Sequence, residues 1–178
     1  MHGYGLRWTW ANNNTSPAVC PHTKLKQRPY GKLAAKIGCS MSHYLLWRHC
    51  IDLDEPILIL EHDAVFIAPL PEVSFSKIIQ INDPAGATPH GKAWSDAMVK
   101  RGPGVFPVSH VFPDDVPDGL AGNSAYLVKP RAAEGLCSAF HDIGVWPNDA
   151  TMCRQLFELQ ELYPFVTRVE QEESTTSV

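Results

Sequence analysis

The sequence predicts an α/β fold, because apolar segments of strand length alternate along the chain with longer segments of helical period. The clearest helix spans residues 32–51, and its apolar residues recur at three- and four-residue spacing: Leu33, Ile37, Met41, Tyr44 and Leu45. The clearest strand is the continuous apolar run at residues 57–60. With 178 residues, of which 44% are hydrophobic, the chain can bury the core of a single domain, expected to cover residues 1–178.

The elements of the first half follow in order. Residues 1–30 are aromatic, rich in Asn and interrupted by three prolines, so an irregular lead-in is expected there. In the first helix we expect Ile37, Met41 and Leu45 to be buried. Gly38 costs about 1 kcal/mol relative to Ala, which indicates close packing or the approach of a ligand. Residues 54–56 turn into the strand at 57–60, which residues 64–67 could extend.

The second half is expected to contain shorter elements. Residues 77–81 form a second strand, and residues 82–104, rich in Gly and Pro, form a long surface excursion. Two short strands, at 109–112 and 125–128, bracket an acidic turn. Pro130 suits the first turn of a helix that ends near Phe140, and Asp149 could cap another helix reaching Leu162. Residues 165–169 form a last strand, and residues 170–178 a mobile tail.

Composition excludes several classes of protein. The formal net charge of −4, without a basic block, argues against a nucleic-acid partner. The sequence contains no run of eighteen apolar residues, so no transmembrane segment is predicted, and the first eight residues lack the apolar core of a signal peptide. Five cysteines without metal-ligand spacing favour buried free thiols in a reducing compartment. The expected location is the cytoplasm, with peripheral attachment to a membrane left open.

Two carboxylates mark the most informative site. Glu61 and Asp63 flank His62 directly after the apolar strand at 57–60. Open α/β sheets bind ligands at the carboxyl ends of their strands. Alternate carboxylates offer hard oxygen ligands for Mg²⁺ or Mn²⁺, which in turn could hold a diphosphate. The competing interpretation is a surface acidic pair that follows a core strand.

Five stretches in order carry a resemblance to a known family. They are Gly38-Cys39 with Ser42-His43, the strand ending at Glu61-His62-Asp63, residues 122–128 followed by Pro130, Ala132 and Ala133, the turn Trp146-Pro147-Asn148-Asp149, and Gln171 with Ser174. Over residues 33–177 the chain resembles glycosyltransferase family 25, the sugar transferases of the lipooligosaccharide and collagen-galactosyl type.

The resemblance implies a GT-A fold, an open sheet with helices on both faces. It implies an inverting hexosyltransferase that uses Mn²⁺ or Mg²⁺ to move a sugar from a nucleotide donor, expected to be a UDP-sugar, to a saccharide such as lipopolysaccharide. Asp63 is then a metal ligand, Glu61 faces the ribose or the metal, and Asp149 is the general base. The resemblance places five weaker candidates near the substrates: Ser42, His43, Gly122, Asn123 and Gln171. Cys39 is expected to serve packing.

Two departures from the family pattern keep alternatives open. His62 stands where the family has Asp, and this could alter the metal preference or impair the site. The family's opening apolar strand and its Asn-Leu…Arg segment are absent, so a fold truncated at its N-terminus is expected.

A non-catalytic GT-A-like domain that binds a glycan or a protein is therefore the second hypothesis. A metal-dependent hydrolase using His43, His62 and Asp63 lacks supporting ligand spacing. A structural role for His43 and helix capping by Asp149 remain alternatives.

Overall fold

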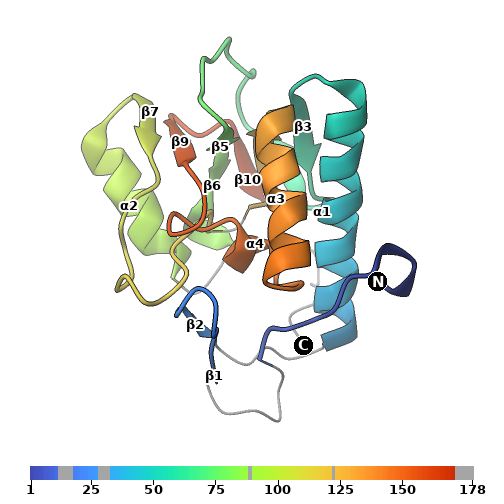
Figure 1. The fold of residues 1–178 in the computed structure, drawn as a ribbon. Helices are drawn as coiled ribbons and strands as arrows, with labels where there is room; N and C mark the ends of the chain where they lie inside the picture. The colour runs from blue at the N-terminus through green and yellow to red at the C-terminus, as the bar shows by residue number, and fades with distance from the viewer. Residues whose placement is uncertain (12–17, 28–32, 88–89, 122, 171–178) are drawn as a thin grey trace.

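The computed structural model describes residues 1–178 except 12–17, 28–32, 88–89, 122 and 171–178 (Figure 1). The helices are α1 (Leu33–Leu53), α2 (Gly91–Arg101), α3 (Pro130–Asp142) and α4 (Asn148–Thr151), with 3₁₀ turns η1 (His2–Tyr4) and η2 (Pro84–Gly86). The strands are β1 (Ala18–Val19), β2 (Lys26–Gln27), β3 (Ile57–Leu60), β4 (Ala64–Phe66), β5 (Ile78–Gln80), β6 (Asn82–Asp83), β7 (Gly104–Pro107), β8 (Ala125–Val128), β9 (Leu159–Tyr163) and β10 (Thr167–Val169). The predicted α/β class is confirmed.

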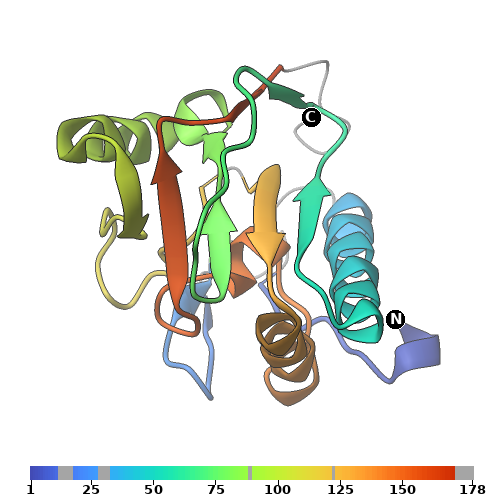
Figure 2. The ribbon, with the colours of Figure 1, turned by 90° about the horizontal axis from the view of Figure 1, so that it is seen from above.

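The largest sheet has five strands in the order β3-β8-β5-β9-β7. β5 and β9 run parallel, and β8 runs antiparallel to both β3 and β5, so the carboxyl ends of β3 and β5 meet the start of β8 at one edge. Smaller sheets have the orders β4-β10-β6 and β1-β2. Figure 2 shows the large sheet with α1 next to β3 at one end and α2 next to β7 at the other.

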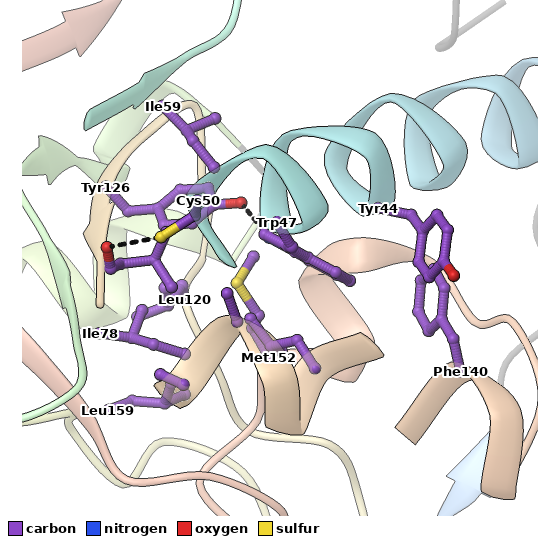
Figure 3. Packing of buried hydrophobic residues seen from close by; sticks show 14 of the residues in the cluster. Tyr44, Trp47, Cys50, Ile59, Ile78, Leu120, Tyr126, Phe140, Met152 and Leu159 are labelled. Carbon is purple, nitrogen blue, oxygen red and sulfur yellow. Dashed lines mark hydrogen bonds between the residues drawn. The ribbon is translucent and has the colours of Figure 1, made fainter. Parts of the chain in front are cut away.

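The two faces of this sheet bury different cores. α1 and α3 pack together and bury one face, with Trp47 against Phe140 at a ring-centroid distance of 5.2 Å, and Ile78 of β5 belongs to the same buried cluster (Figure 3). The other face buries a cluster that includes Ile79 and Ala125, and the partly buried Val73 and Phe75 pack against this cluster. Ile78 and Ile79 face opposite sides of the sheet because successive side chains alternate along a strand.

The first helix forms as predicted, but its buried face is different. The buried residues are Ser40, His43, Tyr44, Trp47 and Cys50, whereas Leu45 is 46% exposed. Ile37 and Met41 are only partly buried. The prediction that Ile37, Met41 and Leu45 are buried is therefore wrong for Leu45 and only partly met by Ile37 and Met41, because the larger aromatic rings of Tyr44 and Trp47 select the face that meets α3. A Cβ on Gly38 would meet no atom of the described residues within 4 Å, so close packing among them does not explain this glycine.

Other boundaries also differ from the predictions. Residues 64–66 do not extend β3 but pair with β10 in a separate sheet. Residues 82–104, expected to be a surface excursion, contain β6, η2, α2 and the start of β7, and α2 buries Trp94 and Met98. Residues 109–112 form no strand. The helix expected from Asp149 to Leu162 is only the single turn α4, and the chain then enters β9.

The remaining predictions agree better with the structure. β5 lies within the strand predicted at 77–81, β8 covers residues 125–128 as expected, and α3 begins at Pro130. The lead-in is irregular as predicted, yet Leu6 and Trp10 are buried in the core. Of the predicted tail, only Glu170 is among the described residues. None of the described helices is both long enough and apolar enough to cross a bilayer.

Candidate functional site at the carboxyl end of β3

The ladder between β3 and β8 fixes the position of Glu61. The Glu61 backbone N–H donates to the Ser124 carbonyl at 2.7 Å, which continues the β3–β8 pairing by one residue. The chain then turns, since the Ala64 N–H donates to the Glu61 carbonyl at 3.1 Å. β3 is an edge strand in which only Ile59 is buried, so its carboxyl end opens toward solvent. The carboxylate is therefore presented at the sheet edge predicted from the sequence.

Two side chains donate hydrogen bonds to the Glu61 carboxylate. Oε1 lies 2.9 Å from His43 Nε2, and Oε2 accepts a hydrogen bond from the Ser124 hydroxyl at 3.3 Å. Burial alone would raise the pKa of Glu61, but the hydrogen bonds from His43 and Ser124 outweigh it and lower that pKa below its usual value. The side chain remains 28% exposed, so the carboxylate is ionised, oriented and accessible.

The His43 ring is held from its other side. Nδ1 lies 2.8 Å from the Tyr126 hydroxyl, which also accepts a hydrogen bond from the Trp47 indole N–H at 2.8 Å. One assignment satisfies every group: Tyr126 accepts from Trp47 and donates to Nδ1, and Nε2–H donates to Glu61. The His43 and Tyr126 rings also stack at 5.7 Å. His43 therefore turns toward the end of β3.

α4 brings a second carboxylate to the same edge. The Asn148 Oδ1 lies 3.4 Å from the Cys39 thiol, which also lies 3.9 Å from Glu61 Oε1. The next residue, Asp149, is partly buried, and its Oδ1 accepts a hydrogen bond from the Ala150 N–H at 2.9 Å. Burial raises the pKa of the Asp149 carboxyl. The positive charge of Lys36 lowers this pKa, and the negative charge of Glu61 raises it further. Because α4 follows Pro147, Asp149 is not its N-cap residue.

Asp63 lies beyond the turn and differs from Glu61 in its surroundings. Its Oδ1 is buried and has no hydrogen-bond partner among the described residues. Its backbone carbonyl accepts a hydrogen bond from the Glu170 N–H at 3.0 Å, while the neighbouring His62 is exposed. A buried carboxylate oxygen without a donor is a suitable ligand for a hard cation such as Mn²⁺ or Mg²⁺. Asp63 therefore fits the predicted role of metal ligand.

A different set of atoms is grouped more closely. Cys39 Sγ, His43 Nε2 and Glu61 Oε1 lie within 4.8 Å of one another, and Asp63 is not part of this group in the described chain. Burial, with the negative charge of Glu61 second, raises the pKa of the Cys39 thiol to about 12, so it is protonated. Cys39 was expected to serve packing, but its thiol faces polar atoms of the site.

The weaker candidates divide into three groups. Ser42 is exposed on α1, and its hydroxyl donates back to the Gly38 carbonyl at 3.1 Å. Asn123 is buried with its Nδ2 lacking a partner in the described chain. Gly122 and Gln171 lie outside the described residues.

Sequence reasoning did not assign site roles to Trp47, Tyr126 and Asn148. Trp47 lies four residues after His43 on α1, a spacing that could have indicated a shared face. Tyr126 and Asn148 stand in the stretches that carried the resemblance. Those stretches indicated that the two residues lie near the site, but not what they do there.

One comparison with known proteins bears on this site. Residues 18–83 match the model of a family described as glycosyltransferase family 25 (LPS biosynthesis protein). The chain resembles glycosyltransferase family 25. The matched segment carries α1, β3 and the Glu61-His62-Asp63 turn, whereas β8 and α4 lie outside it. No curated protein matches the chain.

Proposed function

We propose that this chain is a metal-dependent glycosyltransferase that moves a sugar, with inversion, from a nucleotide-sugar donor to a saccharide acceptor such as lipopolysaccharide. The observation that carries the proposal is the meeting of three elements at one sheet edge. α1 supplies His43, the end of β3 supplies Glu61, and α4 supplies Asp149. The resemblance to family 25 in residues 18–83 supports sugar transfer as the chemistry. A UDP-sugar is the proposed donor.

Asp63 is the proposed ligand of the donor's cation. Its buried Oδ1 lacks a partner among the described residues, and the Glu61 carboxylate, held by His43 and Ser124, stands two residues before it. A bound Mn²⁺ or Mg²⁺ would neutralise negative charge on the diphosphate leaving group. Glu61 then faces the donor as an oriented hydrogen-bond acceptor for a sugar or ribose hydroxyl.

Asp149 is the proposed general base. Burial raises the pKa of this carboxyl, and a base whose pKa lies closer to neutrality accepts a proton from a hydroxyl more readily. Lys36 acts on the same group with the opposite sign and limits this rise. An acceptor hydroxyl at Asp149 would lose its proton to the carboxylate as its oxygen attacks the sugar carbon from the face opposite the diphosphate, which gives inversion.

The first test measures donor binding. Mn²⁺ with UDP should raise the melting temperature of the wild-type protein, because a ligand that binds only the folded state stabilises it. Asp63→Asn should abolish this shift and leave the unliganded protein folded. Asp52→Asn, which changes an exposed carboxylate on α1, is the matched control and should shift like wild type. An unchanged shift in Asp63→Asn would refute the metal assignment.

The second test measures turnover. Asp149→Asn should lower transfer or donor hydrolysis by about 10²–10⁴-fold, because it removes a proton acceptor and changes little volume. Binding of Mn²⁺ and UDP should persist. The control is Asp142→Asn, an exposed carboxylate at the end of α3. Turnover that survives Asp149→Asn would exclude Asp149 as the base.

One observation favours the second hypothesis, a GT-A-like domain that binds a glycan or a protein without transfer. Both oxygens of Glu61 are engaged by neighbours within the chain, which limits their availability to a donor. Wild-type protein that binds a saccharide but hydrolyses no nucleotide sugar with Mn²⁺ present would support this function instead.

A further inference from the structure

A cysteine, a histidine and a glutamate converge beside the end of β3. Cys39 and His43 are four residues apart on α1, so their side chains lie on one face of the helix, one turn apart. Glu61 reaches the same point from β3. The three donor atoms Sγ, Nε2 and Oε1 all lie within 4.8 Å of one another. Thiolate, imidazole and carboxylate are the three side-chain ligands of Zn²⁺ in proteins.

We propose that Cys39, His43 and Glu61 form a binding site for a divalent cation of the Zn²⁺ class. This site differs from the hard-cation role of Asp63, and it does not rest on the proposed transferase activity. Sulfur and imidazole ligands select Zn²⁺ or Co²⁺ over Mg²⁺ and Ca²⁺, which prefer oxygen.

The separations between donor atoms suit a small tetrahedral ion. Nε2 and Oε1 lie 2.9 Å apart, and Sγ and Oε1 lie 3.9 Å apart. Bonds of about 2.0–2.3 Å in a tetrahedral zinc site place neighbouring donors roughly 3.3–3.7 Å apart. His43 and Glu61 must therefore separate slightly while the Cys39 side chain moves inward. The three donor atoms already lie within 4.8 Å of one another, so the change asked of the Cys39 and Glu61 side chains is small, while the His43 ring stays in place.

The histidine is held as a metal-bound histidine usually is. In such sites the second ring nitrogen contacts a hydrogen-bonding partner that orients the ring. Here Nδ1 lies 2.8 Å from the Tyr126 hydroxyl, which the Trp47 indole fixes in turn at 2.8 Å. A phenolic oxygen can accept from both nitrogens, so Nε2 can lose its hydrogen and bind the cation. His43 is 3% exposed, so its ring has little freedom to turn away.

The fourth position and the entry path are also present. Asn148 Oδ1 lies 3.4 Å from Cys39 Sγ and can complete the ligand set, as can a water. Glu61 is 28% exposed and provides the side from which an ion enters. On binding, the S–H bond of Cys39 breaks, its proton leaves to solvent, and a sulfur–metal bond forms. Occupancy would engage Glu61 and so inhibit any reaction that uses this carboxylate.

Co²⁺ provides a direct probe, because a cobalt–thiolate bond gives a charge-transfer absorption band in the near ultraviolet. Wild-type protein titrated with Co²⁺ should develop this band to one equivalent, and Zn²⁺ should remove it by displacement. Cys39→Ser should lose the band completely. Cys137→Ser, which changes a partly buried cysteine on α3, is the matched control and should keep it.

Two further variants separate ligation from folding. Glu61→Gln should keep the thiolate band but weaken Co²⁺ binding. Tyr126→Phe should weaken Co²⁺ binding by about 10–100-fold, because it removes the contact that orients the His43 ring, and it should also retain the band. Circular dichroism checks that each variant is folded. A wild-type protein without the band, or a band that survives in folded Cys39→Ser, would overturn the proposal.

Discussion

At the scale of single residues, two buried polar side chains on neighbouring strands share an unusual environment. Gln80 on β5 and Glu161 on β9 are register partners, so they stand side by side on the same face of the sheet. Each is 2% exposed, and each has a buried Oε1 without a hydrogen-bond partner among the described residues. The other oxygen of Glu161 accepts from the Ser109 N–H and hydroxyl. A proton on Glu161 would turn one of these two unpartnered acceptors into a donor.

The Glu161 carboxyl should therefore make stability depend on pH. Burial raises its pKa from 4.5 to about 7 in the folded protein. Because the folded pKa is the higher one, the stabilisation is complete below pH 4.5 and is lost as pH rises through 7. The expected loss, relative to a variant without this group, is about 3 kcal/mol. Urea unfolding of wild type and Glu161→Gln between pH 4.5 and 8 measures it.

Glu161→Gln should remove this part of the pH dependence and make the protein more stable than wild type at pH 8. Glu134→Gln, at an exposed position on α3, should reproduce the wild-type profile. Parallel profiles for wild type and Glu161→Gln would show that Glu161 is ionised throughout.

At the scale of elements, α1 carries a glycine that its packing does not require. Gly38 lies in the helix interior, where a Cβ would meet no atom of the described residues within 4 Å. Gly38→Ala should therefore stabilise the protein by about 0.5–1 kcal/mol, because Ala has less backbone freedom to lose on folding. Thermal or urea unfolding measures this change.

The comparison for this prediction is Gly119→Ala. A Cβ there would lie 2.0 Å from the Met152 carbonyl oxygen, so this variant should destabilise the protein by about 1–3 kcal/mol. If Gly38→Ala is more stable but loses donor binding, a ligand approaches α1 at this turn. A destabilised Gly38→Ala would contradict the open surroundings of the helix.

The elements also show why sequence patterns located some parts of the site and not others. Glu61 was predicted because it directly follows an apolar strand, and His43 because the resemblance to family 25 places it near the substrates. The pairing of His43 with Tyr126 depends on β8 lying beside β3, which is a long-range contact that no local period records. The inner face of α1 was misjudged because Leu and Ile fit a helical period as well as Tyr44 and Trp47 do. The sequence predicted that a helix from Asp149 reaches Leu162, although the pairing of residues 159–163 with β5 and β7 makes the end of that segment a strand.

At the scale of the whole molecule, the irregular N-terminal segment is part of the core. Trp10 is 5% exposed, and its ring meets Trp146 edge to face at 4.9 Å. The Trp146 indole N–H donates to the Thr9 hydroxyl at 3.1 Å, and that hydroxyl donates to the Ile143 carbonyl at 2.7 Å. Composition predicted the irregular backbone correctly. It did not indicate burial, because burial of Trp10 depends on a residue far along the chain.

These contacts connect the N-terminal segment to the stretch that positions α4. Trp146 lies two residues before Asn148, so loss of its packing should disturb both the core and the site. Trp10→Ala should reduce the free energy of unfolding by about 3–5 kcal/mol, the usual cost of removing a buried aromatic side chain. Phe66→Ala is the control, since Phe66 is 49% exposed and its loss should cost far less. Urea unfolding followed by circular dichroism measures both variants. A Trp10→Ala protein as stable as wild type would show that residues 1–11 do not contribute to the core.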